Sequence, residues 1–182
     1  MSETPLEPSP PQSVGAWSRL PAGWLARDIA WSQRLSRWGQ RRAYWLLAYG
    51  LARSGDTLFW LVIIGVGLAK GWGVSWRLLW TVLATAVLVF AVKGIFKRKR
   101  PSGRAHDFSH DQYSFPSGHA ARVTAVAVTL SFAQPAWLGV WLVWATAVSL
   151  SRVILARHYL SDITAGWFVG LAVGLIIQQL PL

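Results

Sequence analysis

Long apolar stretches alternate with short charged segments along most of the chain. A helix needs about 20 apolar residues to cross a bilayer, so stretches of this kind predict membrane-spanning helices. Pro135 divides the longest stretch, which predicts a hairpin of two helices there. We therefore expect an all-α, polytopic transmembrane bundle with about five spans, four being the alternative. The apolar stretches are residues 57–69, 74–92, 123–151 and 163–182.

The N-terminal quarter has a different pattern. Residues 1–22 are polar and proline-rich, without the apolar core of a signal peptide, and we expect a disordered tail. Residues 23–52 interleave tryptophans with arginines, which predicts an amphipathic helix lying in the membrane interface. A soluble helix is the weaker interpretation, because nothing soluble follows for it to pack on. The transmembrane domain is then expected over residues 54–182.

Composition supports the membrane interpretation. Of 182 residues, 53% are hydrophobic and only 14% are charged, and 13 are tryptophan, a residue that favours the headgroup level. The net charge of +11 would suggest nucleic acid in a soluble protein. In a membrane protein it indicates instead the anionic bilayer surface or a phosphorylated substrate, so we expect no nucleic-acid partner. The chain has no cysteine, which excludes disulfides and thiolate chemistry.

Ionisable side chains at membrane depth are costly, and here they gather in three clusters. If residues 74–92 run toward one face, the first cluster lies there and the second begins the next span on the same side. The hairpin at Pro135 then returns the chain to that face with the third cluster. All three should therefore meet at one membrane surface. The clusters are residues 93–101, 116–119 and 151–162.

The clusters carry complementary chemistry for an anion. Arginine makes bidentate bonds to phosphoryl oxygens, and Arg100, Arg152 and Lys93 supply such donors. Ser117 and Gly118 offer a hydroxyl and backbone N–H groups just before a helix, which suits an anion. These residues predict a site for a phosphoryl group.

Two histidines add reactive groups to this site. His158 and Asp162 are four residues apart and share a face if that segment is helical, so the carboxylate can hold one ring nitrogen and leave the other as a nucleophile. His119 can protonate a leaving oxygen near neutral pH. Asp162 also continues a stripe of small residues, which should let a neighbouring helix approach closely. That stripe is Gly166, Gly170 and Gly174.

Simpler interpretations exist for each feature. A basic run is usually a membrane anchor, and a single His–Asp pair is more often structural than catalytic. A metal site is disfavoured, because only two histidines fall in the clusters and the nearby cations would repel a divalent ion. We therefore expect no metal and no cofactor. A minor alternative is a surface metal site with the ligands His106, Asp107, His110 and Asp111.

Taken together, the clusters resemble the three-part signature of the type-2 phosphatidic acid phosphatase superfamily. The resemblance covers roughly residues 54–180. It implies a helical membrane enzyme that removes phosphate from lipid phosphates without a metal. The matching motifs are K-x6-RP (Lys93, Arg100, Pro101), PSGH (116–119) and SR-x5-H-x3-D (Ser151, Arg152, His158, Asp162).

The resemblance also implies a role for each site residue. His158 would attack phosphorus to give a phosphohistidine, and Asp162 would orient it. His119 would protonate the departing group and then activate water. The remaining motif residues would hold the phosphoryl oxygens, namely Lys93, Arg100, Ser117, Gly118 and Arg152.

The sequence departs from the family pattern at two points. Arg122, one turn after His119, is an unusual charge at a helix entrance, where it would contact a headgroup or extend toward the interface. Many bacterial relatives have six crossings, and this chain is expected to lack the first of them.

The membrane face and the substrate stay open at this stage. Of the 18 lysines and arginines, 16 are expected on the face with the clusters, which the positive-inside rule places in the cytoplasm. The family resemblance argues for the outer face, and we favour the cytoplasmic face of a bacterial inner membrane. Candidate substrates are phosphatidate, phosphatidylglycerophosphate and polyprenyl phosphates or diphosphates such as undecaprenyl diphosphate. The alternatives are a lipid phosphotransferase, a haloperoxidase or a non-catalytic lipid-binding protein, and the sequence predicts no oligomeric state.

Overall fold

The described part of the chain is built from helices. The computed structural model describes residues 21–101 and 112–181, so the predicted tail and the loop with His106 and His110 lie outside the described residues, apart from Pro21 and Ala22. The helices are α1 (Ala22–Ser36), η2 (Arg37–Gln40), α2 (Arg42–Ser54), α3 (Thr57–Ala69), α4 (Val74–Phe96), α5 (Gly118–Ala133), η3 (Pro135–Trp137), α6 (Leu138–Ile154) and α7 (Leu160–Gln178).

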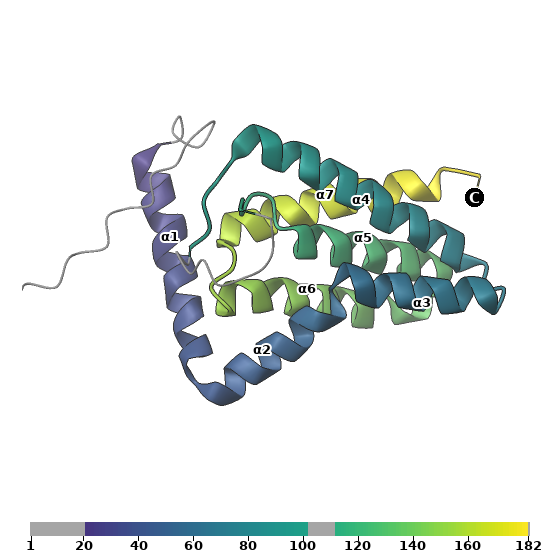
Figure 1. The fold of residues 1–182 in the computed structure, drawn as a ribbon, viewed down its shortest axis with the longest axis horizontal. Coiled ribbons are helices and arrows are strands. Elements are labelled where there is room, and N and C mark those ends of the chain that lie inside the picture. Colours follow the sequence, from purple (N-terminus) through teal and green to yellow (C-terminus); the bar gives the residue numbers. More distant parts are fainter. Residues whose placement is uncertain (1–20, 102–111, 182) are drawn as a thin grey trace, which may run out of the picture.

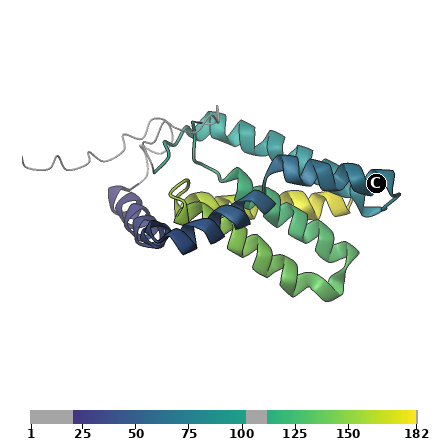
Figure 2. The ribbon, with the colours of Figure 1, turned by 60° about the horizontal axis from the view of Figure 1, so that its bottom comes forward.

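Helices α3 to α7 form an elongated bundle, and α1 lies across one end of it (Figure 1; Figure 2). Helix α5 is central and packs against α4, α6 and α7. Pro135 lies in the short η3 turn between α5 and α6, which confirms the predicted hairpin. The first residues of α5 and α7 and the last residues of α6 are all at the end that α1 crosses.

The glycine stripe of α7 packs directly on α5. A methyl group added at Gly166 would lie 2.8 Å from Ala120 Cβ, and one added at Gly174 would lie 2.7 Å from Val128 Cβ. Both distances are too short for real carbon contacts, so only glycine permits this separation of the two helices. The predicted role of the stripe is confirmed.

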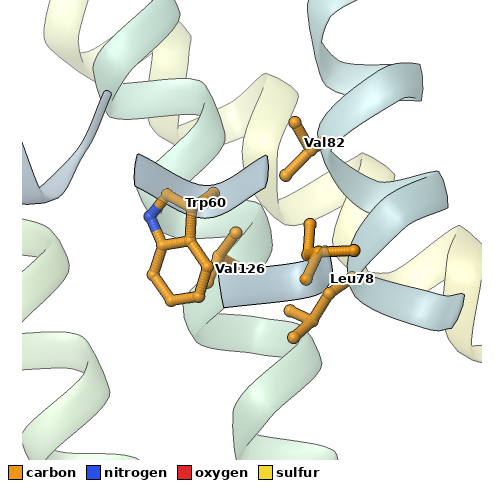
Figure 3. Close-up of a cluster of buried hydrophobic side chains, with 5 residues drawn as sticks. Trp60, Leu78, Val82 and Val126 are labelled. Carbon is orange, nitrogen blue, oxygen red and sulfur yellow. The ribbon is translucent and has the colours of Figure 1, made fainter. Parts of the chain in front are cut away.

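The exterior of the bundle is apolar. Large hydrophobic side chains on α3, α4, α6 and α7 point outward, and Phe90 is the most exposed of them at 81%. Soluble monomers rarely expose apolar surface on this scale. The inner sides of α3, α4 and α5 meet in a cluster around Trp60, Leu78, Val82 and Val126 (Figure 3). The chain is therefore an integral membrane protein with lipid on its outer faces.

The five predicted spans are not established. Within the described residues, α4, Pro135–Ile154 and α7 are long and apolar enough to cross a membrane, and α2 with α3 make a fourth candidate if this pair, bent by 45°, is one span. Helix α5 has only 16 residues. Because α4, α6 and α7 enclose it, α5 is covered by protein over much of its length and does not need the length of a lipid-exposed span.

Residues 23–52 do not form one helix, and their place in the membrane interface stays a prediction. The chain bends through η2, and the two parts, α1 and α2, have different neighbours. The buried side of α1 carries Asp28 and Ser32, which bond to the start of α7. Its tryptophans Trp24 and Trp31 are exposed on the outside. The amphipathic pattern therefore reflects contact with protein on one side of the helix.

Candidate active site

A cleft of about 1400 Å³ opens at the end of the bundle that α1 crosses. Its walls are η2, α2, the second half of α4, the start of α5, and the end of α6 with the turn that follows it. Residues from all three sequence clusters line it, which is the convergence that the sequence predicted. Six of the eight predicted site residues are among them: Lys93, Arg100, Gly118, His119, Arg152 and His158.

Backbone carbonyl groups bind the two cations of the first cluster that line the cleft, Lys93 and Arg100. Lys93 lies in the last turn of α4, is 6% exposed and donates from Nζ to the Tyr113 carbonyl at 3.0 Å. Nη1 of Arg100 donates to the Arg157 carbonyl at 3.4 Å. Both side chains also line the cleft.

The PSGH segment starts α5. Ser117 is the N-cap residue, and its Oγ accepts a long hydrogen bond of 3.4 Å from Ala120 N. Its own N–H donates to the Asp162 carbonyl at 3.0 Å, which ties the second cluster to the third. The Ser117 side chain is fully buried and is not among the residues that line the cleft, so its predicted contact with phosphate stays a prediction.

Gly118 differs from the glycines of the α7 stripe. A methyl group added to it would lie 3.5 Å from Val89 Cγ1, an ordinary contact. Packing within the protein therefore does not require glycine at this position. A ligand that approaches the backbone at the start of α5 would require it.

His158 and Asp162 are neighbours, but they do not share a helix face as the sequence suggested. Helix α7 begins at Leu160, because Asp162 bonds back to the preceding turn: its Oδ2 accepts from Tyr159 N at 2.9 Å. His158 precedes the helix. Its Nδ1 lies 3.5 Å from Oδ2 of Asp162, longer than a well-formed hydrogen bond but within ion-pair range. The carboxylate still stands behind one ring nitrogen, as predicted.

The His158 imidazole is neutral at physiological pH. Burial lowers its pKa to about 4, since desolvation disfavours the imidazolium. The Asp162 carboxylate opposes this effect in part, while Arg100 and Arg152 reinforce it. A neutral imidazole has a free lone pair, which a nucleophile requires.

Sequence reasoning missed a buried ion pair behind Asp162. Arg98 donates from Nη1 to Asp162 Oδ1 and from Nη2 to Asp28 Oδ2, both at 2.6 Å. All three side chains are at most 7% exposed. The guanidinium also lies 3.9 Å from the centroid of the Tyr159 ring. Arg98 stands within the basic run 97–100, where nothing in the sequence distinguishes it from its neighbours.

Sequence reasoning also missed an acid beside the second histidine. Nε2 of His119 lies 2.9 Å from Oδ1 of Asp56, at the break between α2 and α3. Arg122, which the sequence left without an assignment, donates from Nη1 to the Gly55 carbonyl at 2.7 Å. An acid between two apolar segments is itself a functional signal, and it could have pointed to Asp56.

The described residues contain no evident metal centre. Across residues 21–101 and 112–181, no three His, Cys, Asp or Glu side chains gather closely enough to hold a metal ion. The alternative surface site around His106 and His110 lies outside this range.

The apolar exterior and the cleft lined by cations describe an integral membrane protein with a polar cleft at one end of a helical bundle. The sequence model of the PAP2 superfamily matches residues 74–181. The chain therefore belongs to the PAP2 superfamily.

Its relatives bear the names of phosphatases. The chain is 33% identical over 142 residues to the decaprenylphosphoryl-5-phosphoribose phosphatase of Mycobacterium tuberculosis, covering 72% of this chain and 77% of that protein. It is 33% identical over 122 residues to the probable lipid phosphate phosphatase beta of Arabidopsis thaliana, covering 50% of this chain and 57% of the plant protein. The chain thus spans little more than half the length of the plant relative.

The fold has a solved counterpart. The transmembrane PAP2-type phosphatidylglycerolphosphate phosphatase of Bacillus subtilis superposes with a TM-score of 0.74 at 21% identity, over 90% of this chain and 89% of the other. At this identity the likeness concerns the fold. The superposition covers 90% of this chain, whereas the family model matches only residues 74–181. The likeness in fold therefore extends to part of the chain before residue 74.

Proposed function

We propose that the chain hydrolyses a phosphomonoester or diphosphate of a membrane lipid through a phosphohistidine intermediate on His158. One observation carries the proposal. Two histidines from distant segments line the same cationic cleft, and each has a carboxylate at one ring nitrogen. A lipid-binding protein would need the cations but not this pair of imidazoles.

In the first step His158 attacks phosphorus. Because Nδ1 faces Asp162, Nε2 carries the free lone pair. The Nε2–P bond forms as the bond from phosphorus to the leaving oxygen breaks. His119 gives its proton to that oxygen, so the product leaves as an alcohol or a phosphate.

In the second step water attacks the phosphohistidine. His119, now neutral, takes a proton from the water, the new P–O bond forms and the P–N bond breaks. The electron pair returns to His158 Nε2, and inorganic phosphate leaves. Asp162 stays ionised throughout and holds the His158 ring.

The cations stabilise the charge that develops on the phosphoryl oxygens. Lys93, Arg100 and Arg152 line the cleft from the first and third clusters, so they can contact an anion from more than one side. The N–H of Gly118 at the start of α5 adds a backbone donor, and Ser117 is the second residue proposed there. Donors fixed in place before the reaction are usually the largest contribution to catalysis.

The substrate class that we favour is a polyprenyl-linked phosphate, with phosphatidate and phosphatidylglycerophosphate as alternatives. The support is the similarity to a protein named decaprenylphosphoryl-5-phosphoribose phosphatase, of which this chain covers 77%. A cleft bordered by apolar helices suits a prenyl or an acyl chain equally.

For the membrane face we propose the cytoplasmic side of a bacterial inner membrane. Among the described lysines and arginines, only Lys70 and Arg77 lie opposite the cleft end, and Arg77 has a structural reason to be there. It donates from Nη1 to the Ile177 carbonyl at 3.1 Å, at the end of α7. Lys70 is then the one opposing cation without such a contact among the described residues, and the asymmetry of charge supports this orientation.

The test is phosphate release by the purified full-length chain in detergent micelles with EDTA present. The substrates are a polyprenyl diphosphate, a polyprenyl monophosphate, phosphatidate and phosphatidylglycerophosphate, each assayed beside His158→Ala. We expect release that survives EDTA and is lost in the variant. Release that EDTA abolishes, or that His158→Ala retains, would contradict the proposal.

A further inference from the structure

Asp56 is the one acid among the described residues that line the cleft, and the three sequence motifs do not explain its position. It lies between α2 and α3, and its Oδ1 is 2.9 Å from His119 Nε2. The exposed fractions of the two side chains are 32% and 19%, so the contact is sheltered from bulk water. Residues 63 positions apart in the sequence meet here.

The ordinary reason for an aspartate at this position does not apply. Asp56 is the N-cap residue of α3, where aspartate normally accepts a hydrogen bond from a backbone N–H of the first turn. Its side chain makes no such bond. The carboxylate turns toward His119 instead, and Arg53 bonds to its other oxygen at 3.2 Å.

Side chains of α3, α5 and α6 stabilise the break between α2 and α3 that contains Asp56. Arg122 Nη1 donates to the Gly55 carbonyl at 2.7 Å, and Trp60 Nε1 donates to the Ser54 carbonyl at 3.0 Å. Trp144 Nε1 donates to Ser54 Oγ at 3.0 Å. Carbonyl groups freed by a break in an apolar helix must find such donors. Helices α3, α5 and α6 thus all stabilise the break.

Close packing fixes the distance between the break and His119. A methyl group added at Gly55 would lie 2.7 Å from Val148 Cγ1 and 3.2 Å from His119 Cδ2. Any side chain here would displace the break or the imidazole. Glycine therefore brings the backbone beside Asp56 against the histidine.

We propose that Asp56 is a positioning residue for His119, so that the site contains two carboxylate–imidazole pairs. The inference rests on the proposed function, in which His119 gives and takes the proton. Asp56 holds Nε2–H and fixes the ring, which leaves Nδ1 as the nitrogen that protonates the leaving oxygen and later accepts a proton from water. Asp56 itself stays ionised.

The charges around His119 explain why a carboxylate is needed. The cations that act on it are Arg122 of α5 and Arg152 of α6. When His119 takes a proton from water it becomes an imidazolium beside these guanidiniums. The negative charge of Asp56 compensates for them at the ring nitrogen that does not react.

The experiment is a double-mutant cycle in kcat on the lipid that the wild type hydrolyses best. Asp56→Ser keeps a good N-cap for α3 but is too short to reach His119, and Asp56→Asn keeps the length but removes the charge. We expect each to lower kcat about 10- to 100-fold with little change in KM, the range found for carboxylates that orient metal-ligating histidines. In a His119→Ala background, Asp56→Ser should lower kcat no further.

Two comparisons separate positioning from a structural role. Arg53→Gln removes the other partner of Asp56 and should change kcat little, since Arg53 is mostly exposed. The melting temperatures of the four proteins in the cycle should also be non-additive: Asp56→Ser should lower Tm less in the His119→Ala background than in the wild type. This measurement does not require an active enzyme. Asp56→Glu should recover part of the kcat that Asp56→Ser loses.

Two results would overturn the inference. One is an active wild type in which Asp56→Ser leaves kcat unchanged. The other is an effect of Asp56→Ser that persists in full without His119. An inactive wild type contradicts the proposed function, and in that case uncoupled melting temperatures contradict the pairing as well.

Discussion

Replacement of Asp28 by alanine should loosen the contact of α1 with the rest of the protein. Its Oδ2 accepts from Arg98 Nη2 at 2.6 Å, and its Oδ1 accepts from Ser161 N at 3.1 Å, in the first turn of α7. Asp28→Ala therefore removes both an ion-pair partner and a cap. Arg98 retains Asp162 as its second acid.

The magnitude follows from burial. The side chains of Arg98 and Asp28 are 5% and 7% exposed. Removing one partner of a buried pair costs about 3–5 kcal/mol, and we take the lower value because Asp162 remains. For a chain of this size, about 3 kcal/mol corresponds to a decrease in Tm of about 6–12 °C. The charge left on Arg98 should also draw Asp162 away from His158 and lower kcat.

The assay is thermal unfolding of the full-length protein in detergent, followed by tryptophan fluorescence. Arg27→Ala is the matched control, because Arg27 is the exposed neighbour of Asp28 on α1. If Asp28→Ala melts within about 2 °C of Arg27→Ala, less than 1 kcal/mol separates them and the reasoning about the buried ion pair is wrong.

Three further predictions concern the helix contact, the anion site and pH. Gly170→Val should prevent stable folding, because its side chain would enter the Ala121 carbonyl, whereas Gly65→Val meets open space and should purify normally; size-exclusion profiles in detergent compare them. Gly118→Ala should keep the wild-type Tm but lose most phosphatase activity, and equal activity would show that no ligand approaches this backbone. The pKa of His158 is lowered from an ordinary 6.5 to about 4. Between pH 6.5 and pH 4 the unfolded chain therefore binds a proton at His158, whereas the folded chain does not. Stability should fall by about 3 kcal/mol as pH drops from 6.5 to 4, and melting of His158→Asn should lack this component.

The sequence was sufficient for the parts of the site that depend on local patterns. Lys93, His119 and His158 belong to motifs with fixed spacing. The apolar stretches next to these motifs predict the helices and their order along the chain. That pattern also predicts one shared face, because the hairpin at Pro135 requires it. The cleft that these residues line agrees with this prediction.

The missed residues depend on contacts between distant segments. Asp28 and Arg98 are 70 positions apart, and Arg98 and Asp162 are 64 apart. Periodicity within a segment says nothing about such pairs. Residues 23–52 form two helices rather than the one predicted. Their place in the membrane interface stays a prediction, since a helix with one polar and one apolar side looks alike whether it faces lipid headgroups or the end of a bundle.

The number of spans stays a prediction, because hydropathy does not distinguish lipid from protein as the apolar surrounding. Helix α5 has 16 residues and is apolar after Arg122, yet α4, α6 and α7 cover much of it. Helix α3 has 13 residues and continues into α2 through a bend of 45°. A sequence window counts both as crossings.

The central claim is a covalent intermediate on His158, and trapping it is the most direct test. The full-length protein would be mixed with a ³²P-labelled lipid phosphate, quenched in alkali at millisecond times and mapped by mass spectrometry, with His158→Ala as control. The account predicts an alkali-stable, acid-labile phosphate on His158 and none in the variant. Label on another residue, or turnover that proceeds in His158→Ala, would contradict it.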